Sequence, residues 1–91
     1  MAAERLTRQL IDDGELEKAL EITYKVLSED KFYEAAYGLQ MQIFHQMGQY
    51  SMVHTTFKLC RDRFQKNFNA DASLKLKNLY SDLIKDKKPS P

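Results

Sequence analysis

Two glycines that stand 34 residues apart constrain the fold of this chain most strongly. Gly14 lies in the segment DDGELEKAL, and Gly48 lies in the segment QMGQYSMVH. At the same offset, apolar or small residues match one another in four further pairs: Leu10 and Phe44, Leu16 and Tyr50, Ala19 and Val53, Val26 and Cys60. An internal period of this length indicates a structural unit that occurs twice in the chain.

A 34-residue unit with a glycine between two apolar stripes is typical of tetratricopeptide repeats, which are pairs of antiparallel helices. Glycine suits the turn because it adopts positive φ angles without a steric cost. Apolar residues at helical spacing predict the four helices of two such repeats, and Asp30 is the expected N-cap of the third. We expect these helices over residues 3–13, 15–28, 32–47 and 50–67.

A fifth helix is expected after a turn at Asn69, because Asn tolerates the left-handed conformation that ends a helix. This helix begins near Ser73, with Asp71 or Ser73 as its cap, and closes the second repeat. The chain has only three Gly and two Pro, fewer turn residues than a β fold of this length needs. The sequence therefore predicts a single all-α domain over residues 1–85, followed by a disordered tail over residues 86–91.

Charge is divided unevenly along the chain. Residues 1–36 carry nine acidic and five basic residues, whereas residues 37–91 carry four acidic and nine basic residues. This division favours either two solvated faces or a basic half that contacts a partner. Cys60 is the only cysteine, which excludes an internal disulfide. No segment has the ~20 apolar residues of a membrane helix, so we expect a cytoplasmic protein without a membrane partner.

The residue types predict a binding protein, because no catalytic or cofactor motif is present. The three glycines are isolated, which excludes a phosphate loop, and neither His45 nor His54 has a metal ligand at helical spacing. Cys60 falls in a helical apolar stripe and is expected in the core. We therefore expect no enzyme, cofactor or metal. The candidate partner-binding residues are Arg8, Gln42 and His45 on the inner face of the first and third helices, and Lys58 and Arg61 on the basic fourth helix.

The segment FKLCRDRFQKNFNADASLKLKNLYSDLI, residues 57–84, resembles the end of the bacterial transcriptional activator domain of antibiotic-regulatory-type activators. Several positions carry this resemblance: Phe57 and Cys60, Phe68-Asn69-Ala70 at the Leu-Gly-Val-type turn, Ser73 at the cap, and Leu79-Tyr80. The chain departs from the family where prolines are replaced, at Lys31, Ala72 and Leu74. The resemblance covers residues 6–84 without gaps.

This resemblance implies an interaction or oligomerisation domain of a transcription regulator, whose partner is another protein or a second copy. In that family DNA is recognised by a separate winged-helix domain, which this chain lacks. Pairing with a second copy would use the first helix, where Leu6, Leu10 and Ile11 are apolar. Two alternatives remain. In the first, the domain is a free-standing tetratricopeptide adaptor that binds a peptide. In the second, it contacts nucleic acid through its basic fourth and fifth helices.

Overall fold

The computed structural model describes residues 2–85, which form five α-helices and no strand. The helices are α1 (Ala2–Asp12), α2 (Leu16–Glu29), α3 (Glu34–Gln46), α4 (Tyr50–Phe68) and α5 (Leu74–Lys85). This confirms the predicted all-α class. The first four helices begin and end within two residues of their predicted bounds, and α5 begins one residue after Ser73. The predicted tail, residues 86–91, lies outside the described residues.

Gly14 and Gly48 make the two turns that the 34-residue spacing predicts. Their φ angles are 79° and 76°, in the left-handed region that favours glycine. The hydrogen bonds match at the same offset, because Glu15 N–H donates to Leu10 O and Gln49 N–H donates to Phe44 O, both at 2.8 Å. No atom lies within 4 Å of where a Cβ would stand at either glycine, so the backbone conformation alone requires glycine there.

The third predicted turn residue, Asn69, has a φ angle of 50° and ends α4 in the left-handed conformation. The prediction for Asp30 was wrong, because Asp30 ends α2 and does not cap α3. Its amide donates to Val26 O, and its carboxylate accepts the Phe32 amide at 3.0 Å. Asp30 stands three residues before the N-cap position, which is Tyr33. An Asp side chain accepts most readily from the amide two residues on, and that amide belongs to the turn.

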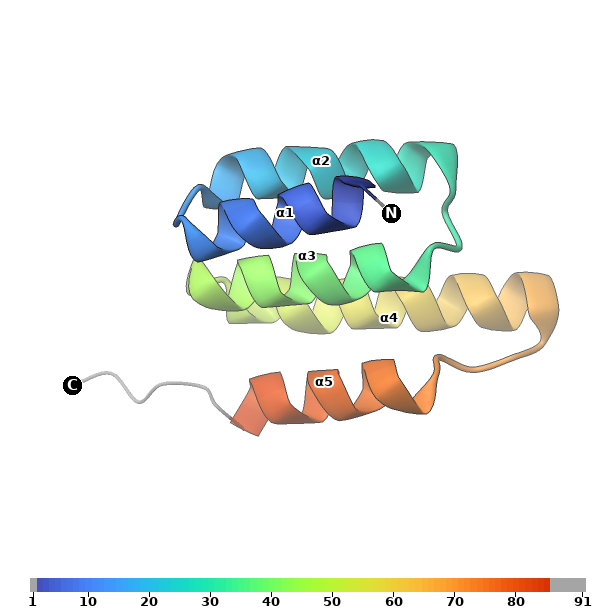
Figure 1. Cartoon of the computed structure of the whole chain (residues 1–91). Coiled ribbons are helices and arrows are strands. Elements are labelled where there is room, and N and C mark those ends of the chain that lie inside the picture. The colour runs from blue at the N-terminus through green and yellow to red at the C-terminus, as the bar shows by residue number, and fades with distance from the viewer. Residues whose placement is uncertain (1, 86–91) are drawn as a thin grey trace.

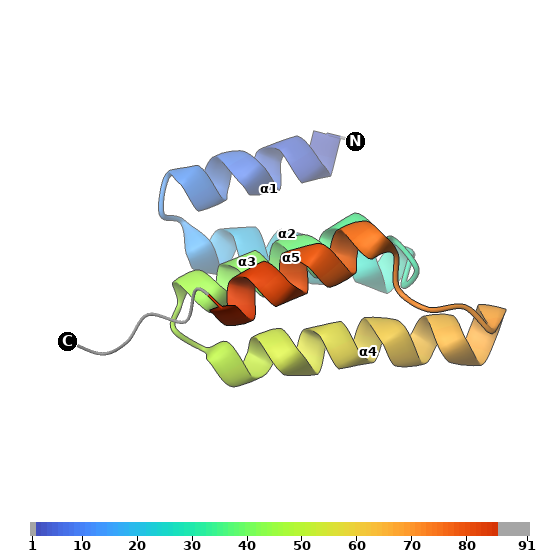
Figure 2. The same ribbon diagram turned by 90° about the horizontal axis from the view of Figure 1, so that it is seen from below.

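Helix α3 is the centre of the domain. It contacts all four other helices, and Figure 1 shows it lying between α1 and α5. Helices α1 and α2 form one antiparallel pair, and α3 and α4 form the next. Helix α5 packs on α3 and α4 (Figure 2). Helices α1 and α5 therefore both pack on α3 but not on each other.

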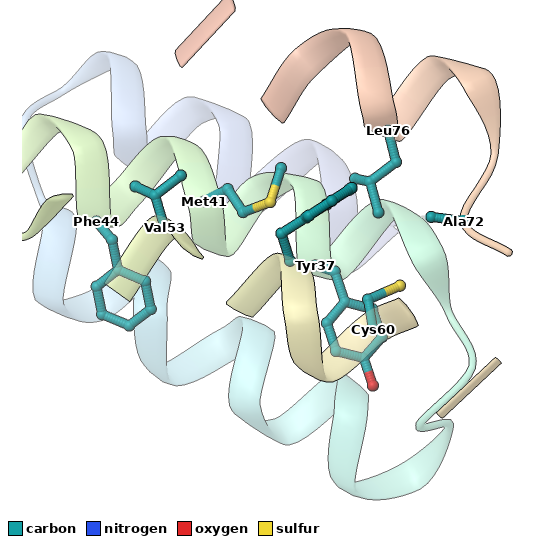
Figure 3. Close-up of a cluster of buried hydrophobic side chains, with 8 residues drawn as sticks. Tyr37, Met41, Phe44, Val53, Cys60, Ala72 and Leu76 are labelled. Carbon is teal, nitrogen blue, oxygen red and sulfur yellow. The ribbon is translucent and has the colours of Figure 1, made fainter. Parts of the chain in front are cut away.

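The buried side chains form two clusters, one on each side of α3. The larger joins α3 to α4 and α5 (Figure 3) and consists of Tyr37, Met41, Phe44, Val53, Phe57, Cys60, Ala72 and Leu76. The smaller joins α3 to the first helix pair and consists of Ile11, Ala19, Leu39 and Ile43. Because α3 contributes to both clusters, its burial holds the two halves of the domain together.

Candidate functional site

An open groove of about 290 Å³ runs between α1, α3 and α5, and we call it the α3 groove. Helix α3 forms the floor, α1 forms one wall and α5 forms the other. The floor consists of Glu34, Ala35, Gly38, Leu39 and Gln42, and the walls consist of Glu4, Arg8, Lys75, Leu76 and Leu79. A Cβ on Gly38 would lie 3.2 Å from Leu79 Cδ2. The small residues of α3 therefore let α5 approach closely on this face.

Both carboxylates of the α3 groove already have partners. Glu4 accepts the Tyr33 hydroxyl at 2.7 Å and pairs with Arg8 at 3.2 Å. The hydrogen bond from Tyr33, followed by that from Arg8, lowers the pKa of the Glu4 carboxyl. Glu34 accepts the backbone amide of Ser73 at 3.0 Å and also the Ser73 hydroxyl. Neither acid is therefore available to a ligand without breaking a contact that joins two parts of the fold.

Ser73 caps α5, which decides between the two predicted cap residues. Its hydroxyl oxygen accepts the Leu76 amide at 3.1 Å, which is the hydrogen bond of an N-cap serine. Because Ser73 also donates to Glu34, the start of α5 is anchored to the start of α3. The position of the second wall of the groove therefore depends on this contact.

Two of the five predicted partner-binding residues meet in the α3 groove. Arg8 lies on the α1 wall and Gln42 on the α3 floor. His45 lies outside this lining, with its ring edge-on to Tyr50 at 5.4 Å between centroids. Within residues 2–85, neither the Gln42 nor the Lys75 side chain forms a hydrogen bond or an ion pair. The groove thus offers half-buried apolar side chains, Ala35 and Leu79, beside an amide and an ammonium group that a ligand can reach.

The other two predicted residues, Lys58 and Arg61, line a separate groove of about 480 Å³ between α4 and α5. Arg61 Nε lies 3.1 Å from Asp71 Oδ1, and Lys77 Nζ lies 2.8 Å from Asp71 Oδ2. The hydrogen bond from Lys77, followed by that from the Ala72 amide, lowers the pKa of Asp71 to about 2. Arg61 is therefore engaged within the fold, whereas Lys58 is exposed.

The basic residues of α4 and α5 line different pockets. Lys75 faces the α3 groove, and Lys58 and Arg61 face the α4–α5 groove with Lys77 close by on Asp71. Arg63 and Lys66 line a third pocket, together with Lys31 from the α2–α3 turn. Lys85 lines a further pocket beside Leu83, so the cations of α4 and α5 are divided among several pockets.

Cys60 is fully buried in the larger cluster, as predicted. Burial raises the pKa of its thiol to about 12, so the thiol stays protonated near neutral pH and is a poor nucleophile. Among residues 2–85, no three side chains of His, Cys, Asp or Glu gather closely enough to hold a metal ion. In the same range, every helix is too short or too polar to cross a membrane.

Sequence reasoning missed the acidic anchor Glu34 of the groove and its unpaired cation, Lys75. A signal for the groove was present on α3, where Glu34, Gly38 and Gln42 recur every fourth residue. Small and polar residues that share one face of an otherwise apolar helix indicate close approach of a neighbour or an open surface.

The described fold is an all-helical domain with an open groove along its central helix. No protein-family model, curated protein or solved structure matches the chain. The resemblance to bacterial transcriptional activator domains, and with it the tetratricopeptide-like repeat, therefore stays a prediction.

Proposed function

We propose that this chain is a non-catalytic protein-interaction domain that holds a short segment of a partner protein in the α3 groove. One observation carries this proposal. Helices α1 and α5 flank α3 without packing on each other, which leaves a groove between two walls in which Ala35 and Leu79 are half-buried. Burying the remaining apolar surface of these side chains against a partner is favourable, and the unpaired side chains of Gln42 and Lys75 can orient the segment that binds there.

The tetratricopeptide-like reading supports the same proposal. The hydrogen bonds of the two glycine turns match at an offset of 34 residues, so α1 and α3 take equivalent places in two helix pairs. In arrays of repeated helix pairs, the equivalent helices line an extended concave surface that binds partners. The resemblance to activator domains supports a parent protein that regulates transcription, in which this domain makes protein contacts.

The groove proposal is tested with a displayed library of random peptides selected on the whole chain. The affinities of the enriched peptides are then measured by fluorescence polarisation. Gln42→Trp fills the groove floor, and Gln46→Trp makes the same exchange at an exposed position at the end of the same helix. We expect at least tenfold weaker binding to the Gln42→Trp variant and unchanged binding to the Gln46→Trp variant. If no peptide is enriched, or if both variants bind equally well, the groove is not the binding site.

Self-association is a second candidate, and it rests on the outer side of α1. Leu6 is 52% exposed, whereas Ile11, which we expected on the same contact surface, is buried within the domain. Light scattering across protein concentration tests this candidate. A dimer that Leu6→Glu dissociates would support pairing through α1, and a monomer at all concentrations would exclude it.

A further inference from the structure

A third pocket, of about 280 Å³, lies where the α2–α3 turn meets the second half of α4. It is lined by Lys31, Asp62, Arg63, Lys66 and Asn67, and we call it the cation pocket. It shares no residue with the α3 groove. Three of its five residues carry a positive charge and one carries a negative charge, which leaves a net charge of +2.

Arg63 is held in this pocket by a neutral group. Its Nη1 donates to the Tyr37 hydroxyl at 2.6 Å, and that hydroxyl donates to the Lys31 carbonyl oxygen at 2.5 Å. Tyr37 is fully buried, and burial raises the pKa of its phenol. The phenol therefore stays protonated and orients the guanidinium without balancing its charge. No carboxylate of residues 2–85 lies within ion-pair distance of Arg63.

The other two cations are also without a counter-ion. The Lys31 ammonium lies 5.4 Å from the centre of the Phe32 ring, an arrangement that favours a cation over the ring face. Lys66 follows Arg63 by three residues on α4, so both side chains project on the same side of the helix. Within residues 2–85, neither lysine forms an ion pair. The neighbouring Asp30 is turned toward the Phe32 amide, which leaves Asp62 as the acid of the lining.

We propose that the cation pocket binds a phosphate monoester. At neutral pH such a group carries a charge of about −1.5 to −2, which matches the net charge of the pocket. Arginine presents a planar set of donors that fits phosphate oxygens. Here one of those donors is fixed on Tyr37, so the orientation of the guanidinium is set before a ligand arrives.

A simpler account would be that basic residues gather at the end of α4 because cations are favourable near a helix C-terminus. That account covers Arg63 and Lys66 but not Lys31, which belongs to the facing turn. It also gives no reason for Arg63 to rest on a buried phenol. An external anion explains why three cations from two elements converge on one pocket.

The test is a titration of the ¹⁵N-labelled chain with phenyl phosphate and with inorganic phosphate, followed by NMR. Potassium chloride at the same ionic strength is the reference. Lys66→Gln and Lys31→Gln each remove one exposed cation of the pocket, and Lys58→Gln is the matched control on the same helix outside it. We expect saturable shifts at residues 62–67 that Lys58→Gln leaves unchanged. Because each pocket variant loses a charged hydrogen-bond donor, we expect about tenfold weaker binding.

The proposal is overturned if chloride reproduces the shifts, if the shifts do not saturate, or if they persist unchanged in both pocket variants. The pocket would then be a solvated cluster of basic residues. A single-stranded oligonucleotide is the last probe. If it binds more tightly than phenyl phosphate, with a steep loss in added salt that depends on Lys66, the monoester assignment is wrong and the pocket contacts a nucleic-acid backbone.

Discussion

The ring of Tyr80 lies flat on the ring of Phe57, with 4.0 Å between the centroids and 5° between the planes. The hydroxyl of the same tyrosine lies 2.5 Å from Nδ1 of His54. These contacts join the middle of α5 to α4, while Ser73 joins the start of α5 to α3 through Glu34. Helix α5 carries one wall of the α3 groove, so the groove is only as stable as these attachments.

Replacing Tyr80 by Ala should loosen α5 selectively. We expect a loss of about 2 kcal/mol in the free energy of unfolding, since a half-buried ring and its stacking contact are removed. Tyr80→Phe keeps the stacking and loses only the contact with His54, so it should cost about 1 kcal/mol or less. Urea unfolding measures both values. If Tyr80→Phe costs as much as Tyr80→Ala, the hydroxyl and not the ring holds α5.

The turn glycines should resist substitution because of their backbone conformation and not because of crowding. Gly48→Ala should destabilise the domain by about 1 kcal/mol, since its φ angle of 76° is unfavourable for a residue with a Cβ. Gly48→Asn should cost less, because Asn tolerates this conformation as Asn69 does. The midpoints of thermal unfolding compare the variants. Equal midpoints for glycine and alanine would show that the turn adopts another conformation.

Asp71 should make stability depend on pH in the acid range. Its pKa is lowered from 3.8 to about 2 in the folded chain, so the folded state favours the ionised form. The contribution to stability is complete above about pH 4 and is lost as pH falls toward 2. Asp71→Asn should be less stable than the wild type at neutral pH, and the difference should disappear near pH 2.

Urea unfolding from pH 2 to pH 6 measures this dependence. The control is Asp82→Asn, which alters an exposed carboxylate of α5 that forms no ion pair within residues 2–85. A difference between wild type and Asp71→Asn that stays constant across this range would contradict the role of the Lys77 and Arg61 contacts.

Gln40 is a buried side chain whose replacement should stabilise the domain. It is 3% exposed, and its amide nitrogen has no hydrogen-bond partner within residues 2–85. Gln40→Met keeps the length of the side chain and removes the unpaired donor, so we expect a gain of about 1 kcal/mol. Gln42→Met, in the open groove, should change stability by less than about 0.5 kcal/mol. A loss of stability in Gln40→Met would show that the amide is hydrogen-bonded in solution.

Local signals in the sequence predicted the helices and the turns well. Gly14, Gly48 and Asn69 stand where the backbone adopts positive φ angles, a preference that belongs to the residue type itself. The one wrong cap, Asp30, shows the limit of this reasoning. An Asp can cap a helix or the turn before it, depending on where the first helical turn begins. Here α3 begins after Tyr33, three residues beyond Asp30, and the Tyr33 hydroxyl donates to Glu4.

The candidate sites were predicted less completely. The structure brings Arg8 and Gln42 into one groove, but nothing in their spacing indicates that Lys75 and Glu34 complete the same groove. Arg63 and Lys66 lie on the same helix as Lys58 and Arg61. The structure places Arg63 and Lys66 in a pocket with Lys31 and places Lys58 and Arg61 in another groove, because different sides of α4 meet different neighbours.

The sequence by itself determined the helical class, the approximate bounds of the first four helices and the two glycine turns, because each follows from local periodicity and backbone preference. Only the tertiary structure decided which side chains meet. Glu34 reaches Ser73 across 39 residues of chain, and Arg63 reaches Tyr37 across 26. Such contacts depend on how apolar faces pack against one another in three dimensions, and no short-range pattern of residues encodes that packing.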